Sequence, residues 1–112
     1  MQELKIAQKW EDMTQYAYIM LRNIPKSERF TLGAEIRVML WAGVRLIVKA
    51  NYSMNKLPLL METDVTIKIL QAMIRTGHGL KIIDNKKYEI ISAHLVEIGK
   101  MLGGWIKSQK KG

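Results

Sequence analysis

A chain of 112 residues has room for one hydrophobic core, and without cysteine it cannot form disulfides, thiolate metal sites or a catalytic thiol. Its 18 lysine and arginine residues outnumber its 10 aspartate and glutamate residues, and the net charge of +8 favours polyanions or acidic surfaces as partners. Residues 1–13 carry charges where a secretory signal would be apolar. No uncharged run approaches the roughly 20 residues of a membrane span. We therefore expect one cytoplasmic domain, residues 1–112.

Pro25, Pro58 and the segment 77–85 divide the chain into four stretches, each of which we expect to be a helix. In the first stretch, apolar residues recur at spacings of three and four, the period of one helical face. This predicted inner face consists of Ile6, Trp10, Met13, Ala17, Met20 and Ile24. Pro25 disfavours helical geometry at Ile24 and should end the first helix there.

The second helix should begin near Ser27 or Thr31, which can both cap a helix, and should fade around residues 51–55. Its predicted inner face consists of Ile36, Leu40, Gly43 or Val44, and Ile47. The third helix should run from Pro58, which suits a first helical turn, to about Thr76. Two apolar rows compete for its inner face, so contacts on two sides are expected. The rows are Leu60, Ile67, Leu70 and Ile74 against Met61, Val65, Ile69 and Met73.

The fourth helix should begin near Asp84 and has the most regular pattern of the four. Its apolar residues alternate three and four apart, as in a heptad seam: Tyr88, Ile91, Leu95, Ile98, Leu102 and Trp105. Short connections make neighbouring helices antiparallel. The expected fold is therefore all-α, an up-down-up-down four-helix bundle.

The sequence offers little for catalysis. His78 and His94 have no acid at metal-ligand spacing beside them, so we interpret His78 as a turn residue between two glycines and His94 as a helix-surface or interface residue. There is no phosphate-binding G-x-x-x-x-G-K-[ST] loop, and Glu62 and Asp64 would point in different directions on a helix. We expect a non-enzymatic protein that needs neither metal nor cofactor.

Basic residues fall into rows with helical spacing, and all of the excess positive charge lies beyond Glu35. On the second helix Arg37, Arg45 and Lys49 are spaced around Trp41 in steps of four, a pattern typical of a phosphate-binding surface with an aromatic platform. The pattern is equally compatible with a Trp41 that belongs to the core and is merely flanked by bases.

The third and fourth helices carry further basic residues. Lys68 and Arg75 are seven apart and share a face of the third helix; on the fourth, Lys100, Lys107 and Lys111 share a face opposite the seam. Charged faces of this kind often contact only solvent. Few acidic residues lie near these lysines and arginines or near Lys110, however, which favours contacts with phosphates and therefore binding that weakens with added salt. Nucleic acid is the partner we expect.

Gly103 and Gly104 lie within the pattern of the fourth helix, where each glycine costs roughly 1 kcal/mol relative to alanine. Another backbone should therefore approach them closely, either a neighbouring helix of the same bundle or a second subunit. Together with Trp105 and the wide apolar arc of the third helix, the glycine pair suggests self-assembly.

Two blocks of the sequence resemble a known family. The run 97–107, E-I-G-K-M-L-G-G-W-I-K, resembles the C-terminal signature of accessory variability determinant (Avd) proteins of diversity-generating retroelements. The run 24–30, I-P-K-S-E-R-F, with Leu32-Gly33 and Ile36-Arg37, is similar to the first loop and second helix of the same superfamily. That superfamily also includes the four-helix proteins encoded in 23S ribosomal RNA intervening sequences.

Resemblance to Avd implies a basic four-helix protomer that forms a pentameric barrel and binds both the reverse transcriptase of the retroelement and nucleic acid. It would hold template RNA and polymerase together during error-prone cDNA synthesis; whether it binds DNA too stays open. Arg75 matches a family arginine, and Lys100 and Lys107 match basic positions of the signature. The other candidates, Arg37, Arg45, Lys49, Lys68, Lys110 and Lys111, rest on charge and spacing.

Two other hypotheses stay open. The chain could be an intervening-sequence-type bundle protein of uncertain role, or a basic adaptor that binds an acidic protein surface. Loss of binding with added salt and displacement by unrelated RNA would separate a nucleic-acid binder from these.

Overall fold

The computed structural model describes residues 2–111, with side chains from residue 5 onward, and that part of the chain is helical without any strand. The helices are α1 (Gln2–Arg22), α2 (Lys26–Arg29), α3 (Leu32–Tyr52), α4 (Leu57–Gly79) and α5 (Asn85–Lys111). The four predicted helices are thus present. The single turn α2, between α1 and α3, was not predicted as a separate element.

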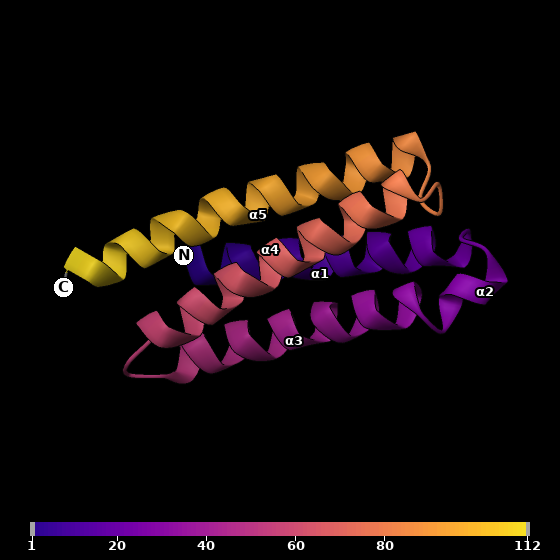
Figure 1. Ribbon diagram of the computed structural model, residues 1–112. Helices are drawn as coiled ribbons and strands as arrows, with labels where there is room; N and C mark the ends of the chain where they lie inside the picture. The colour runs from indigo at the N-terminus through magenta and orange to yellow at the C-terminus, as the bar shows by residue number, and fades with distance from the viewer. Residues whose placement is uncertain (1, 112) are drawn as a thin grey trace.

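The long helices run alternately up and down and form a four-helix bundle, as predicted (Figure 1). Each long helix packs against the next one in the chain, and α1 closes the bundle by packing against α5. Consequently α1 and α4 lie at opposite corners of the bundle, and so do α3 and α5. The molecule measures 46 × 22 × 19 Å.

The longest helix, α5, extends beyond the rest of the bundle. It has 27 residues against 21 in α1, which makes it about 9 Å longer at 1.5 Å per residue. Its C-terminal end, yellow in Figure 1, passes the N-terminal end of α1 and the loop between α3 and α4. Trp105 is its last buried residue, so residues 107–111 lie outside the core.

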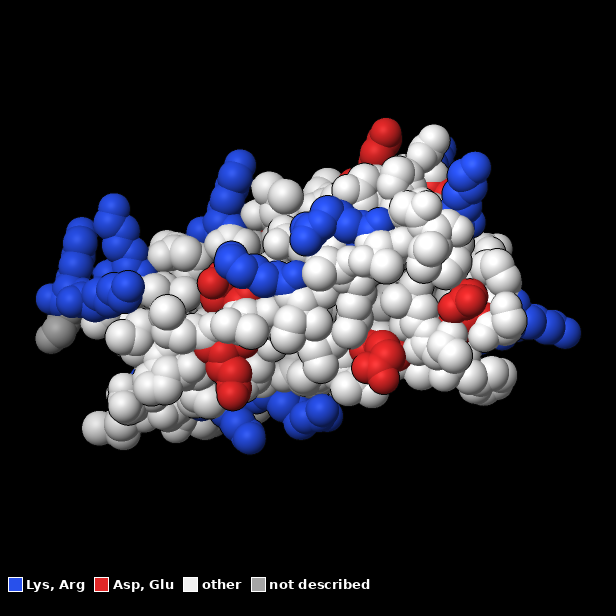
Figure 2. Space-filling view, viewed as in Figure 1, with Lys and Arg blue, Asp and Glu red and all other residues white. Residues whose placement is uncertain are grey.

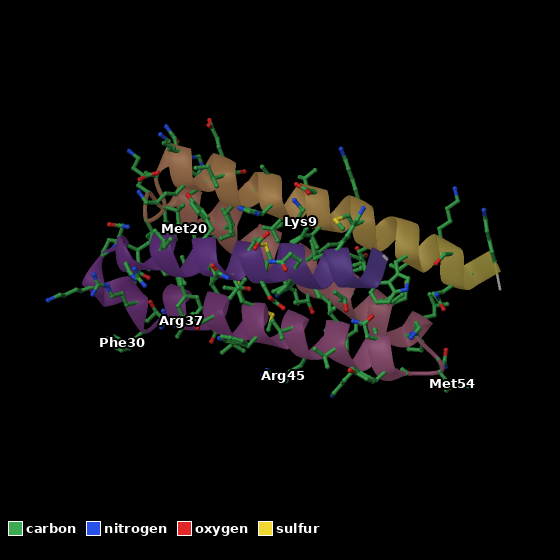
Figure 3. The ribbon with its side chains drawn as sticks, turned by 180° about the vertical axis from the view of Figure 1, so that it is seen from behind. Lys9, Met20, Phe30, Arg37, Arg45 and Met54 are labelled. Atoms are coloured by element: carbon green, nitrogen blue, oxygen red, sulfur yellow. The ribbon has the colours of Figure 1, made fainter. Side chains whose placement is uncertain are left out.

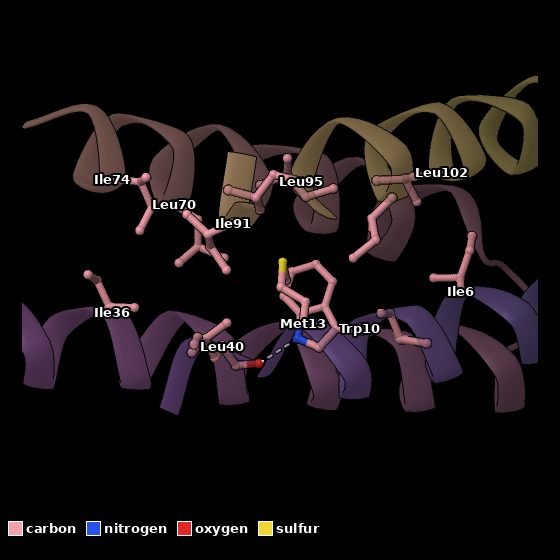
Figure 4. Packing of buried hydrophobic residues seen from close by; sticks show 14 of the residues in the cluster. Ile6, Trp10, Met13, Ile36, Leu40, Leu70, Ile74, Ile91, Leu95 and Leu102 are labelled. Atoms are coloured by element: carbon pink, nitrogen blue, oxygen red, sulfur yellow. Dashed lines mark hydrogen bonds between the residues drawn. The ribbon is translucent and has the colours of Figure 1, made fainter. Parts of the chain in front are cut away.

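The core is centred on Trp10, which is only 1% exposed. Its indole Nε1 donates a 2.8 Å hydrogen bond to the carbonyl oxygen of Leu40, across the α1–α3 interface (Figure 4). A Cβ added to Gly43 would overlap the Trp10 ring, so this glycine lets α3 approach α1. Around Trp10 the predicted inner faces of α1, α3 and α5 are buried, with Tyr88 half-buried.

The structure decides between the two apolar rows of α4. Leu60, Ile67, Leu70 and Ile74 are buried against the neighbouring helices. Met61, Val65 and Ile69 remain 45%, 54% and 40% exposed, and Met73 is partly buried. The protomer therefore uses only half of the wide apolar arc that the sequence shows.

The third predicted helix ends three residues later than expected, and its connection to the next helix lies at residues 80–84, inside the predicted segment 77–85. α4 continues to Gly79, and His78 lies in its last turn, where its ring stacks on Tyr88 with centroids 4.1 Å apart. Gly77 is buried, and a Cβ there would come within 2.9 Å of Leu32 and 2.8 Å of Ile83. Gly77 thus lies at a close packing contact within a helix and not in a turn.

Polar groups define the helix ends. Asp84 Oδ1 accepts a 2.9 Å hydrogen bond from the backbone N–H of Lys87 and caps α5. At the end of α3, the Lys56 ammonium donates to the carbonyl oxygens of Ala50, Asn51 and Ser53. The predicted cap Thr31 does precede α3, but its hydroxyl donates to Glu28 Oε1 and caps no backbone N–H.

Over the described range, no helix has the length and apolar character that crossing a membrane requires.

Candidate nucleic-acid interface

The predicted basic row of α3 lies on the outside of the bundle. Arg45 and Lys49 are exposed and Arg37 is partly buried. Trp41 is 47% exposed, and its indole Nε1 donates a 2.8 Å hydrogen bond to the Tyr18 hydroxyl of α1. Trp41 is therefore a surface ring and not a core residue, which removes the alternative that the sequence left open.

At the start of α3, three arginine side chains surround one pocket of about 260 Å³, which we call the arginine pocket. It is lined by Tyr18, Leu21, Arg22, Arg29 and Arg37. The guanidinium of Arg29 donates to the carbonyl oxygen of Arg22 at 2.9 Å, and that of Arg37 donates to the carbonyl oxygen of Arg29 at 2.8 Å. These bonds bring the end of α1, the turn α2 and the start of α3 together.

Sequence reasoning selected Arg37 but missed Arg22, Arg29 and Tyr18. Arg22 and Arg29 lie within residues 1–35, where the numbers of acidic and basic residues are equal, so that segment shows no excess of positive charge. In the fold no acidic side chain of the described residues lines the pocket. Figure 3 shows Arg37 beside α1 and Arg45 farther along α3, and Arg45 does not line the pocket.

The two predicted basic residues of α4 differ in their surroundings. The Lys68 ammonium lies 3.5 Å from the Asp64 carboxylate, one turn earlier on the same helix, so its charge is locally matched. Arg75 is exposed near the end of α4, and none of the ion pairs found among the described residues involves it.

The predicted lysines of α5 are all exposed. Lys107, Lys110 and Lys111 lie on the projecting end of the helix and Lys100 lies within the length of the bundle. Figure 2 shows basic side chains gathered over this projecting end, while acidic and basic side chains alternate along the middle of the visible face.

One protomer does not bring all the predicted basic residues together. The α3 row and the α5 row lie at opposite corners of the bundle, because α3 and α5 are not neighbours. Arg37 and Arg75 lie at one end, since α4 is antiparallel to α3, and the lysines of residues 107–111 lie at the other. A single continuous basic surface would need more than one copy of the chain.

The glycine pair of α5 is exposed, whereas Trp105 is buried at 4% exposure. A Cβ added to Gly103, or to Gly99 one turn earlier, would have no described atom within 4 Å. A neighbouring helix of the same protomer therefore does not explain Gly103. The second explanation, contact with another subunit, stays a prediction.

The shifted pKa values belong to contacts between or at the ends of helices. The hydrogen bond and charge of Glu97, 2.9 Å away on α5, raise the pKa of Lys9 on α1. The side-chain hydrogen bond from Lys87 lowers the pKa of Asp84, and the same contact raises the pKa of Lys87. Burial raises the pKa of Tyr16, whose ring stacks on the partly buried His94.

Within the described residues, no group of three His, Cys, Asp or Glu side chains is placed to hold a metal ion.

A family model described as bAvd-like matches residues 4–109, which is nearly the whole chain. No curated protein matches the sequence.

Proposed function

Since the chain belongs to the bAvd-like family, we propose that it is the non-catalytic accessory subunit of a diversity-generating retroelement, a homopentamer that binds the reverse transcriptase and its template RNA. The observation that carries the proposal is the family match over residues 4–109, in a chain with a net charge of +8. The bundle would act as a basic scaffold in the cytoplasm, with all catalysis supplied by the polymerase.

Exposed apolar surface supports self-assembly. Met61, Val65 and Ile69 recur every fourth residue along the outer side of α4, where the protomer leaves them exposed. On the neighbouring helix α5, Gly99 and Gly103 leave open space beside the backbone, so a second helix could approach closely. Apolar rows and small residues of this kind are buried when subunits of a closed oligomer meet.

The distribution of charge supports RNA as the partner. The projecting end of α5 carries Lys107, Lys110 and Lys111 without an acid, and Arg75 and Lys100 are exposed cations on the surface of α4 and α5. Closed assembly would repeat these groups around an axis, which would supply the continuous basic surface that one protomer lacks. Lys68 should contribute less than the others because Asp64 already neutralises it.

Assembly is tested by light scattering on the purified chain. The wild type should have the mass of five protomers. Replacing exposed Val65 with Glu, or Gly104 with Leu, should give smaller species with unchanged helical circular dichroism, whereas Trp105→Ala should lower stability by about 3–5 kcal/mol because Trp105 is in the core. A wild-type monomer would refute the pentamer.

RNA binding is tested by fluorescence anisotropy with a labelled single-stranded RNA at several salt concentrations. Replacing Arg75, Lys100 and Lys107 together by Ala should reduce the slope of log K against log salt by about 2, since each phosphate contact to a single strand contributes roughly 0.7. Lys68→Ala serves as the control, because the charge of Lys68 is already paired with that of Asp64. A slope unchanged by the triple substitution would remove those residues from the interface, and a wild type indifferent to RNA would refute RNA binding.

Competition and capture separate the remaining hypotheses. Single-stranded DNA as competitor shows whether DNA is bound too. Capture of a purified reverse transcriptase by the immobilised chain, retained after nuclease treatment, would support the accessory role. RNA binding without polymerase binding would favour an intervening-sequence-type bundle protein, and binding of acidic proteins without RNA would favour a basic adaptor.

A further inference from the structure

The arginine pocket brings together positive charge that the protein does not neutralise. Arg22, Arg29 and Arg37 line it, no acidic side chain does, and the ion pairs found in the described part of the chain involve other residues. Nε of Arg29 is buried and has no hydrogen-bond partner among the described residues. Like charges around one small pocket repel each other, and an anion bound there would remove the repulsion and offer acceptors to the guanidinium groups.

An aromatic surface adjoins this pocket. A second depression, of about 410 Å³, is lined by Thr14, Gln15, Tyr18, Ile19, Arg22 and Trp41. It shares Tyr18 and Arg22 with the arginine pocket, so the two depressions adjoin between α1 and α3, and we call them together the α1–α3 groove. The hydrogen bond from Trp41 to the Tyr18 hydroxyl holds both aromatic side chains in place along this groove.

We infer that the α1–α3 groove binds one unpaired nucleotide of a single strand, with its phosphate among Arg22, Arg29 and Arg37 and its base against Trp41. The inference rests on the proposed RNA binding and adds to it a contact site that is separate from the exposed cations of α4 and α5. It also moves the site from the predicted row of α3 to a groove in which Arg45 and Lys49 take no part.

Phosphate chemistry fits this groove better than other anions do. Guanidinium groups donate two parallel hydrogen bonds to phosphate oxygens. A protein carboxylate would use the arginines alone and leave the neighbouring rings without a partner, whereas a nucleotide carries an anion and a flat ring a few ångströms apart. Base stacking on an aromatic side chain is tolerant of sequence and suits a strand with unpaired bases.

Trp41 supplies its own signal for the test. It is 47% exposed, whereas Trp10 and Trp105 are 1% and 4% exposed, so a base stacked on Trp41 should quench the accessible part of the tryptophan fluorescence. The probe is a short single-stranded oligoribonucleotide, titrated into the full chain while intrinsic fluorescence and anisotropy are recorded. Adenosine monophosphate and inorganic phosphate serve as minimal probes of the groove.

The variants separate pocket binding from general electrostatics. Arg22→Gln and Arg45→Gln each remove one exposed arginine charge, but only Arg22 lines the groove. We expect Arg22→Gln to weaken RNA binding about tenfold and Arg45→Gln no more than about twofold, since a bidentate contact is lost only in the first. Trp41→Leu should abolish the quenching and weaken RNA binding. Trp41→Phe should restore the affinity, because it keeps an aromatic ring on which a base can stack, although it loses the hydrogen bond to Tyr18.

The outcomes distinguish this inference from the proposed function. If the wild type binds no RNA, both are overturned. If it binds RNA with salt dependence but Arg22→Gln equals Arg45→Gln and the fluorescence is unchanged, RNA binding stands and the groove is refuted. Thermal melting and light scattering of each variant show whether it keeps its fold and assembly; a loss of affinity in Trp41→Leu that Phe does not restore also counts against stacking.

Discussion

Gly43 and Gly103 are both helical glycines, yet the structure predicts opposite effects of replacing them with Ala. At Gly43 the new Cβ would overlap the Trp10 ring, which is fully buried and bonded to the Leu40 carbonyl oxygen. At Gly103 the new Cβ would meet no described atom within 4 Å. The first substitution must displace a large core side chain, and the second only changes the helix propensity.

The magnitude follows from three contributions. Overpacking of a core costs about 1–3 kcal/mol, and loss of the Trp10–Leu40 hydrogen bond leaves buried groups unsatisfied at about 1–3 kcal/mol. Alanine returns about 1 kcal/mol over glycine in a helix. Gly43→Ala should therefore lower the free energy of unfolding by about 1–5 kcal/mol, and Gly103→Ala should raise the stability of the protomer by up to about 1 kcal/mol.

Urea unfolding followed by circular dichroism measures both effects at one low protein concentration, because assembly would add to the apparent stability. The melting temperature should move by about 4 °C for each kcal/mol. A Gly43→Ala variant as stable as the wild type would refute the close packing of α3 on Trp10. At high concentration, Gly103→Ala should also weaken assembly if the glycine face meets another subunit, which light scattering would detect.

Two further predictions concern the ends of helices. Asp84 has a lowered pKa in the folded state, so its contribution to stability should be present above the pKa of the unfolded chain and be lost as the pH falls through the folded value. Thermal melts should thus show Asp84→Asn less stable than the wild type at pH 7, with the difference shrinking as the pH is lowered through the folded pKa of Asp84; a constant difference would show that the charge has no role. Replacing Lys56 by Met removes three hydrogen bonds to the end of α3 and should cost about 1–2 kcal/mol in urea unfolding. Lys86→Met, at an exposed lysine, is its control, and equal stability of the two variants would contradict a role for the cap.

The helical faces could be predicted where the period of apolar residues is unambiguous. The faces of α1 and α5 are correct because each has one apolar row and therefore one buried side. On α4 the two apolar rows have similar composition. Which row is buried depends on the helices that pack against α4, and the periodicity of the sequence carries no information about those neighbours. The glycines show the same limit: the sequence does not distinguish Gly43, Gly77 and Gly103, and only the tertiary structure shows that the first two are closely packed and the third is not.

The candidate site was predictable only in part. Helical spacing identified the row of Arg37 and Trp41, and exposure of Trp41 settled that the ring is on the surface. Arg22 and Arg29 come from α1 and α2, and their convergence on Arg37 depends on how the chain turns between α1 and α3. The net charge of residues 1–35 is zero, and counting charges along the sequence could not show that the acidic residues of this segment do not line the arginine pocket.

Closure of the bundle by α1 and α5 also sets the order in which the chain can gain its contacts. Three of the four helix interfaces join helices linked by short connections, and only the α1–α5 interface brings distant parts of the sequence together. Helical proteins rich in local contacts fold within microseconds to milliseconds. We expect the α1–α5 interface, with its Lys9–Glu97 ion pair, to form last, so substitutions there should speed unfolding more than they slow folding. A new chain would thus complete its own fold before it meets another copy, and any assembly would start from finished protomers.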